Sequence, residues 1–154
     1  MGSVWLVCDT SGSMIEGGKR LIMRGLVRQV EQFHRLGYAP KRDLKLVLWS
    51  DDAISHPWNP AEEVPSELFK CSGSAAGDAL VRLVGEPPDD KVLLLTDGFW
   101  PDESRAAIKQ WKDAMALGAL RVIKVGADAN PKLKGADVFE AEDFWIAMEG
   151  WLDK

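Results

Sequence analysis

The chain opens with VWLVCDTSGSM (residues 4–14), in which an apolar run ends abruptly at Asp9 and is followed by Ser11 and Ser13. An apolar run without polar alternation is typical of a strand that is covered on both faces. The polar residues would then lie in the turn at the end of that strand. Three short oxygen-bearing side chains at this spacing suit a metal ion, a phosphate group or a simple strand end, and the rest of the sequence decides among them.

Length and composition indicate one globular domain that spans residues 1–154, with 46% hydrophobic and 28% charged residues. The formal net charge of -5 argues against a nucleic-acid partner. With two cysteines and two histidines, the chain has no Cys/His set for zinc. No apolar stretch reaches the roughly 18 residues of a membrane span, and no signal-peptide pattern precedes the first strand, so we expect a cytoplasmic protein without a membrane partner.

Strand and helix patterns alternate along the chain. Further apolar runs predict strands at Leu44–Trp49, Val92–Leu95, Leu120–Val125 and, more weakly, Val138–Phe139. Apolar residues three and four positions apart predict amphipathic helices at Ile22–Phe33, Ala79–Val84, Ile108–Met115 and Phe144–Trp151. This alternation predicts an α/β fold: an open, Rossmann-like, mostly parallel sheet with helices on both faces.

One segment departs from the alternation. The stretch WSDDAISHPW (49–58) reads as a strand, an acidic turn and a short return strand that Pro57 ends. This pattern is typical of an antiparallel edge strand. The parallel strands would still end at one edge of the sheet, where ligands of such folds bind.

Three distant segments should therefore meet at that edge. They are Asp9-x-Ser11-x-Ser13, the loop GSAAGDAL (73–80) and the strand end LLLTDG (93–98). In this order they resemble the three motifs of the von Willebrand factor type A domain, which binds a divalent cation at its metal-ion-dependent adhesion site (MIDAS). The resemblance extends over nearly the whole chain. It departs at Ser74, where the family most often has threonine.

The resemblance implies a set of metal ligands. Ser11, Ser13 and Ser74 would be hydroxyl ligands, and Asp9 and Asp97 would act directly or through bound water. Mg²⁺ is the expected ion, with Mn²⁺ or Ca²⁺ as alternatives. An all-oxygen set with two carboxylates also suits Mg²⁺ on chemical grounds.

The family's use of such a site implies a protein-interaction module and not an enzyme. Another protein would supply a Glu or Asp to the metal, and the chain would be a monomer or a subunit of a hetero-complex, in a microbial stress or defence assembly. His34 and His56 lie outside the three loops, so no general base is evident.

Two other functions stay open. Asp9 could be the nucleophile of a phosphotransfer enzyme, although Thr10 and Ser11 stand where such enzymes have a lysine or a second acid. The metal could also stiffen a scaffold.

Two residues near the loops have open roles. Trp100 either anchors an interface or packs against its own loop, and Asp128 could flank the site.

Overall fold

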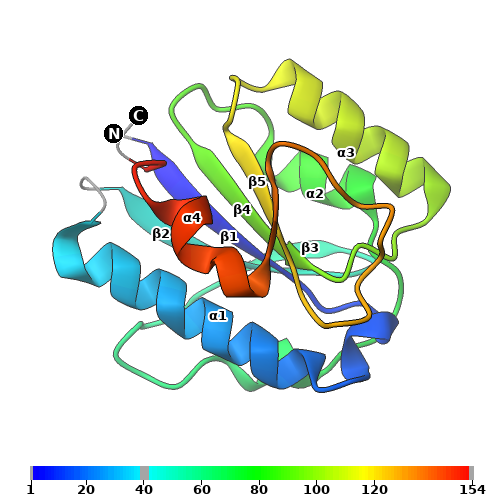
Figure 1. Cartoon of the computed structure of the whole chain (residues 1–154), viewed down its shortest axis with the longest axis horizontal. Coiled ribbons are helices and arrows are strands. Elements are labelled where there is room, and N and C mark those ends of the chain that lie inside the picture. The colour runs from blue at the N-terminus through cyan, green and yellow to red at the C-terminus, as the bar shows by residue number, and fades with distance from the viewer. Residues whose placement is uncertain (1, 39–41, 153–154) are drawn as a thin grey trace.

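A computed structural model describes residues 2–38 and 42–152, and a six-stranded sheet runs through its centre (Figure 1). Its strands, in the spatial order β3-β2-β1-β4-β5-β6, are β1 (Ser3–Asp9), β2 (Asp43–Trp49), β3 (Ala53–His56), β4 (Lys91–Thr96), β5 (Leu120–Lys124) and β6 (Val138–Glu140). β3 pairs antiparallel with β2, and all other neighbours pair parallel. The predicted sheet, mostly parallel with one antiparallel edge strand, is confirmed.

Helices cover both faces of this sheet, as Figure 1 shows. The α-helices are α1 (Lys19–Phe33), α2 (Gly77–Val84), α3 (Asp102–Ala114) and α4 (Phe144–Met148), and the shorter helical segments are η1 (Gly12–Ile15), η2 (His34–Tyr38), η3 (Ser66–Phe69) and η4 (Ala141–Asp143). α1 and α4 pack on one face, and α2 and α3 pack on the other. In the described parts of the chain, no helix is both long enough and apolar enough to cross a membrane.

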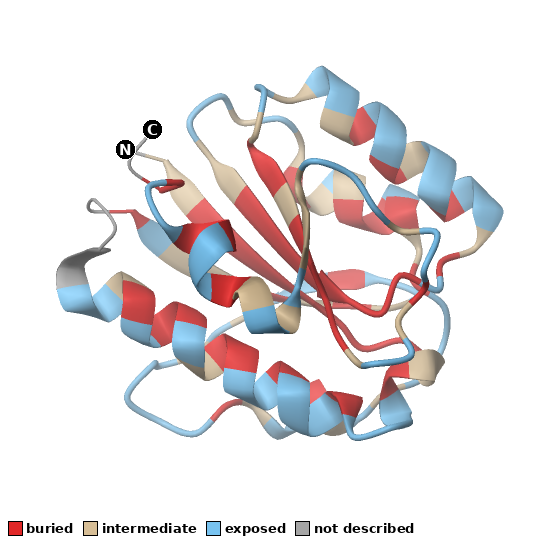
Figure 2. Cartoon of the chain, in the orientation of Figure 1, coloured by how far each residue is buried: buried red, intermediate tan, exposed pale blue. Residues whose placement is uncertain are grey.

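The central strand β1 shows why its sequence lacks polar alternation. Leu6 and Cys8 point into the core beneath α1 and α4, whereas Trp5 and Val7 point into the core beneath α2 and α3. Successive side chains of a strand face opposite sides of a sheet, and here both sides are buried (Figure 2).

The order of the strands places the end of β1 at a distinctive point. β1 lies between β2 and β4, so the chain leaves it toward one side of the sheet and later returns on the other side. The carboxyl ends of these three parallel strands lie at the same edge, and loops that diverge there leave room for a ligand. This edge carries Asp9 at the end of β1 and Asp97 directly after β4.

The last helix is shorter than its spacing predicts. α4 ends at Met148, and Gly150 then turns the chain with a φ of 72°. The turn carries Trp151 back onto the sheet, where its indole Nε1 donates a hydrogen bond to the Gly118 carbonyl at 2.6 Å. Trp151 therefore fills the core as expected, but it does so from a turn and not from the helix.

The fully buried Leu6 should be decisive for stability. Leu6→Ala should lower the free energy of unfolding by about 3 kcal/mol, because the loss of the side chain leaves a cavity in the centre of the sheet. Urea denaturation would measure this value. The matched control is Leu117→Ala at a fully exposed leucine, and equal losses from the two substitutions would contradict the described core.

Candidate metal centre

Backbone hydrogen bonds between loops fix the first loop after β1. The amide of Thr10 donates to the Trp49 carbonyl at 2.7 Å, which holds the loop against the end of β2. The amide of Gly12 donates to the Gly73 carbonyl at 2.9 Å, and the Thr10 carbonyl accepts from the Ser72 amide at 2.9 Å. Two backbone hydrogen bonds therefore join the first loop directly to the loop before α2.

Asp9, at the start of the first loop, is buried with 1% of its surface exposed. Its Oδ1 accepts hydrogen bonds from the Ser11 amide at 2.8 Å and from the Ser11 hydroxyl at 2.6 Å. Because the Ser11 hydroxyl has a single hydrogen and donates it to Asp9, its oxygen lone pairs are left for a cation or another donor. The Ser13 Oγ lies 3.5 Å from the Ser11 Oγ, so the two hydroxyls are neighbours.

Thr96 is a site residue that the sequence reasoning missed. Its hydroxyl donates to Asp9 Oδ2 at 2.6 Å and accepts from the Gly98 amide at 3.0 Å and the Trp100 indole Nε1 at 2.9 Å. One hydroxyl thus uses its whole hydrogen-bonding capacity to join the first loop to the third loop, which follows β4 and begins at Asp97. Trp100, which is 7% exposed, packs against its own loop and is not an exposed anchor. The sequence does carry a signal for this role, because Thr96 directly precedes the predicted ligand Asp97.

Asp97 is fully buried, and both of its oxygens have partners. Oδ1 accepts from the Phe99 amide at 3.2 Å, and Oδ2 accepts from the Lys19 ammonium at 3.1 Å. Burial lowers the pKa of Lys19, but the hydrogen bond and charge of Asp97, helped by Asp128, outweigh burial and raise this pKa overall. Lys19 is a second residue that the sequence reasoning missed, since a lysine at the start of a helix reads as exposed.

The loop before α2 is held by an acidic residue from the turn between β2 and β3. The Ser74 amide donates to Asp51 Oδ1 at 3.0 Å. Gly73 has a φ of 76°, and a Cβ there would lie 2.2 Å from Asp51 Oδ2, so only glycine fits at this position. Asp51, which lies in the acidic turn after β2, therefore positions the loop before α2.

The three predicted serine ligands line one hollow of about 390 Å³. Its walls are formed by Ser11, Ser13, Gly73, Ser74, Phe99, Trp100, Pro101, Arg105 and Asn130. Asp9 and Asp97 do not line the hollow; they are buried, and Asp9 holds the hydroxyl of Ser11 from behind. The structure thus brings the five predicted residues to one place, since Asp9 is hydrogen-bonded to Ser11 and Asp97 pairs with the Lys19 ammonium that also contacts the Ser13 carbonyl.

This donor set fits a hard cation bound by oxygen. Uncharged serines line the hollow, and two buried carboxylates nearby supply negative charge. Within residues 2–38 and 42–152, no three Cys, His, Asp or Glu side chains cluster in a way that could hold a metal ion. A site here therefore depends on serine oxygens and does not resemble a zinc centre built from Cys and His.

Burial makes the Asp9 carboxyl a weaker acid. It raises the pKa of this carboxyl to about 6, although hydrogen bonds from Ser11 and Thr96 oppose the rise, and the negative charge of Asp97 adds to it. Without a bound cation, an ionised Asp9 therefore costs free energy. A positive ion in the hollow would offset that cost.

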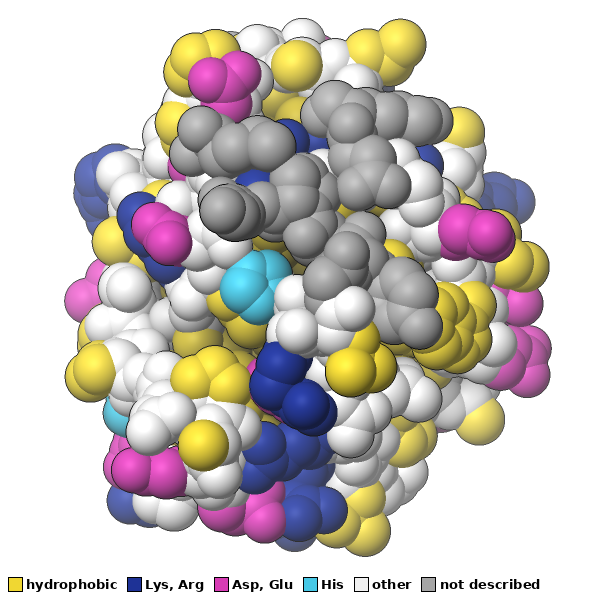
Figure 3. All heavy atoms as spheres, turned by 90° about the vertical axis from the view of Figure 1, so that its left-hand side faces the viewer, with side chains coloured by type: hydrophobic (Ala, Val, Ile, Leu, Met, Phe, Trp, Pro, Cys, Tyr) yellow, Lys and Arg dark blue, Asp and Glu magenta, His cyan; other side chains and the backbone are white. Residues whose placement is uncertain are grey.

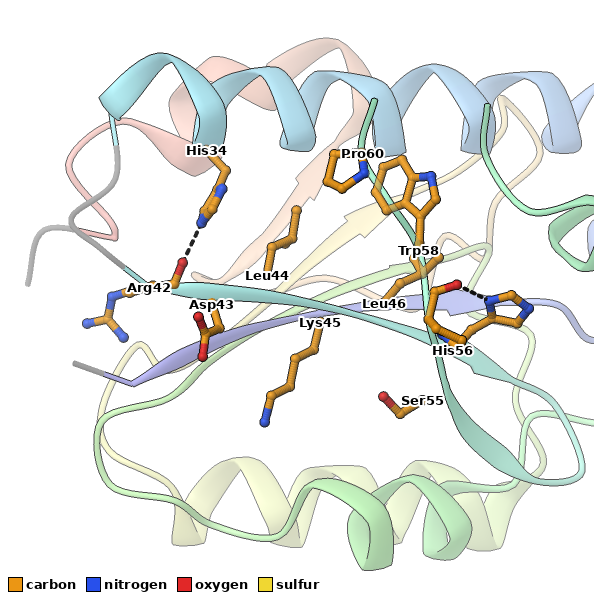
Figure 4. Close-up of a pocket in the computed structure, with 11 residues that line it drawn as sticks. His34, Arg42, Asp43, Leu44, Lys45, Leu46, Ser55, His56, Trp58 and Pro60 are labelled. Carbon is orange, nitrogen blue, oxygen red and sulfur yellow. Dashed lines mark hydrogen bonds between the residues drawn. The ribbon is translucent and has the colours of Figure 1, made fainter. Parts of the chain in front are cut away.

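The two histidines lie elsewhere, in a second hollow along the open edge of β2 (Figure 4). His34 Nε2 pairs with the Arg42 carbonyl, and His56 Nε2 lies 2.9 Å from Glu67. Figure 3 shows a histidine together with a strip of basic side chains on the side of the molecule where the chain begins. Neither histidine lines the hollow that the serines share.

Thr96→Val should lower the free energy of unfolding by about 2 kcal/mol, because Asp9, Gly98 and Trp100 all lose a buried hydrogen-bond partner. Chemical denaturation would measure it. The matched control is Thr10→Val, a buried threonine whose hydroxyl makes one hydrogen bond, to the Trp49 carbonyl. A loss no larger than that of the control would refute the joining role of Thr96.

The Asp9 carboxyl should titrate near pH 6 in the metal-free protein. ¹³C NMR in the presence of EDTA would follow it, with the exposed Glu63, whose pKa the hydrogen bond from Arg24 lowers to about 2, as the internal control. Because folding raises the pKa of Asp9 above its ordinary value of 3.8, the contribution of Asp9 to stability is full at low pH and is lost as the pH rises through about 6. This loss amounts to about 3 kcal/mol. An Asp9 midpoint below that ordinary value would contradict the buried geometry.

No protein-family model and no curated protein sequence matches the chain. Solved structures do match. The manganese-loaded TRAP protein of Plasmodium vivax is 13% identical with a TM-score of 0.63, over 99% of this chain and 73% of that one. A von Willebrand factor type A protein of Catenulispora acidiphila is 18% identical with a TM-score of 0.64, over 98% of this chain and 42% of that one.

A third match is proximal thread matrix protein 1 (PTMP1) of the mussel byssus with a zinc-occupied MIDAS motif, at 17% identity and a TM-score of 0.57, over 96% of this chain and 45% of that one. The chain spans less than half the length of PTMP1 and of the Catenulispora protein. At these identities the likeness establishes the architecture: the chain has the von Willebrand factor type A fold.

Proposed function

We propose that this chain is a von Willebrand factor type A domain that binds a divalent cation, Mg²⁺ in the first instance, and uses it to recognise another protein. One observation carries the proposal. Three serines from two loops line a single hollow, and two buried carboxylates lie next to them: Asp9 is hydrogen-bonded to Ser11, and Asp97 pairs with the Lys19 ammonium that also contacts the Ser13 carbonyl. That arrangement supplies oxygen donors and compensating charge at one place.

Ser11, Ser13 and Ser74 would hold the ion through their hydroxyl oxygens. Asp9 and Asp97 would act from behind, through these hydroxyls or through water. When bound, the metal would supply a positive centre that a carboxylate can approach from the open side of the hollow. Manganese in TRAP and zinc in PTMP1 support a divalent ion in this fold. Because these two ions differ, the ion that this chain prefers has to be measured.

The surroundings of the hollow suit a protein partner. The Phe99 side chain is 46% exposed beside the hollow and offers apolar contact area. Arg105 lines the same hollow, and its guanidinium, which also pairs with Asp102 at 3.0 Å, adds positive charge. We infer that the partner supplies a Glu or Asp from a segment with neighbouring apolar residues.

We propose a binding module rather than an enzyme. As the nucleophile of a phosphotransfer reaction, Asp9 would need a free and accessible oxygen. It is 1% exposed, and each of its oxygens already accepts at least one hydrogen bond. This geometry disfavours the phosphotransfer alternative. We also propose a cytoplasmic location, with which the two free cysteine thiols are consistent. A hetero-complex and a microbial stress or defence assembly stay part of the proposal.

Isothermal titration with Mg²⁺, Mn²⁺ and Ca²⁺ would test metal binding. Asp9→Ala should weaken the affinity by about 100-fold, because Ser11 loses the acceptor that orients its hydroxyl. Asp52→Ala is the matched control, since Asp52 is an exposed acid of the neighbouring turn whose carboxylate accepts from the Ala53 amide. Equal affinities for the two variants would refute the metal site.

Partner binding needs its own measurement. Proteins captured by the wild type in Mg²⁺ should be lost with EDTA and with Asp9→Ala, and retained by Asp52→Ala. If the metal binds and raises the melting temperature but the captured proteins do not change, the metal stiffens a scaffold and the recognition proposal fails.

A further inference from the structure

Lys19 brings an ammonium group to Asp97, one of the buried carboxylates of the candidate metal centre. It is the first residue of α1, it follows two glycines with positive φ, and it is 1% exposed. Its Nζ lies 3.1 Å from Asp97 Oδ2 and 3.3 Å from the Ser13 carbonyl. The ammonium therefore contacts the first and third loops at once.

A third segment completes the surroundings of this ammonium. Asp128 Oδ2, in the loop after β5, lies 3.5 Å from Nζ, and the Phe99 ring centre lies 5.5 Å away. Asp128 thus flanks the site, as the sequence suggested. The carboxylates of Asp97 and Asp128 both face one positive charge.

The path of the Lys19 side chain is also accommodated by the backbone. Gly126 adopts a φ of 98°, and a Cβ there would lie 3.0 Å from both Cγ and Cε of Lys19. A larger residue would press on the aliphatic stem of the lysine. The loop after β5 therefore leaves room for this side chain to reach Asp97.

We propose that Lys19 is a resident cation that holds the loops of the site in place when no metal is bound, and that its charge lowers the affinity for a divalent ion. The first half rests on the observed ion pair alone, because a buried carboxylate without a partner is strongly destabilising. The second half rests on the proposed metal-binding function. Lys19 shares Asp97 with any bound ion, and their like charges repel.

Lys19→Met tests both halves, since it keeps the apolar stem and removes the charge. In EDTA its melting temperature should fall by about 6 °C or more, because Asp97 loses its counterion. Its affinity for Mg²⁺ should rise at least about tenfold by isothermal titration. Saturating Mg²⁺ should raise its melting temperature more than that of the wild type.

Arg20→Met is the matched control. It removes one positive charge from the next residue of the same helix, and Arg20 is exposed and contacts the Phe69 carbonyl instead of the site. If Lys19→Met and Arg20→Met give the same melting temperature in EDTA, or if Lys19→Met does not bind Mg²⁺ more tightly than the wild type, the inference is overturned.

A double variant separates charge from packing. In EDTA, Lys19→Met combined with Asp97→Asn should regain about half or more of the lost melting temperature, because neither charge is then left unpaired. Simple addition of the two single effects would mean that Lys19 acts through packing, which would overturn the ion-pair role.

The outcomes also distinguish this inference from the proposed function. A wild type that binds Mg²⁺ and captures partners through Asp9, while Lys19→Met behaves like Arg20→Met, would remove the inference and leave the proposed function intact. The opposite outcome is also distinct. If Lys19→Met is destabilised in EDTA, is rescued by Asp97→Asn and binds Mg²⁺ more tightly, but partner capture does not depend on metal, the inference stands and the proposed recognition function fails.

Discussion

A buried carboxylate at the end of the central strand is the constraint around which this end of the molecule is built. Asp9 must ionise or keep a proton in a place with almost no water, and burial makes ionisation costly. Its oxygens are satisfied by Ser11 on one side and Thr96 on the other. The same hydrogen bonds that offset the cost of burying Asp9 also join the loop after β1 to the end of β4 and fix the orientation of the Ser11 hydroxyl.

Much of the fold could be predicted, because its signals are local. Uninterrupted apolar runs marked the buried parallel strands, and Pro57 marked the end of the antiparallel edge strand. The end of α4 was missed, since Trp151 keeps helical spacing although Gly150 turns the chain before it. Periodicity reports which residues are buried, but it does not report whether a helix or a turn carries them.

The candidate site was likewise predicted in part. The motifs named the three serines and two aspartates, and the structure gathers them at one edge of the sheet. Lys19, Asp51 and Thr96 were missed because their roles exist only between segments that are distant in sequence. Nothing around Lys19 in the sequence shows that the side chain is buried against Asp97; only the tertiary arrangement does.

The contacts of Asp9 also determine when the site can exist during synthesis. Asp9 leaves the ribosome before its partner Thr96, which follows 87 residues later, and β4 must be in place beside β1 before the two can meet. Until β4 has been synthesised, a nascent chain therefore carries the first loop without the strand that completes it. The site can therefore capture a ligand only after this non-local pairing has formed, and a fragment that contains the first motif without β4 cannot reproduce it.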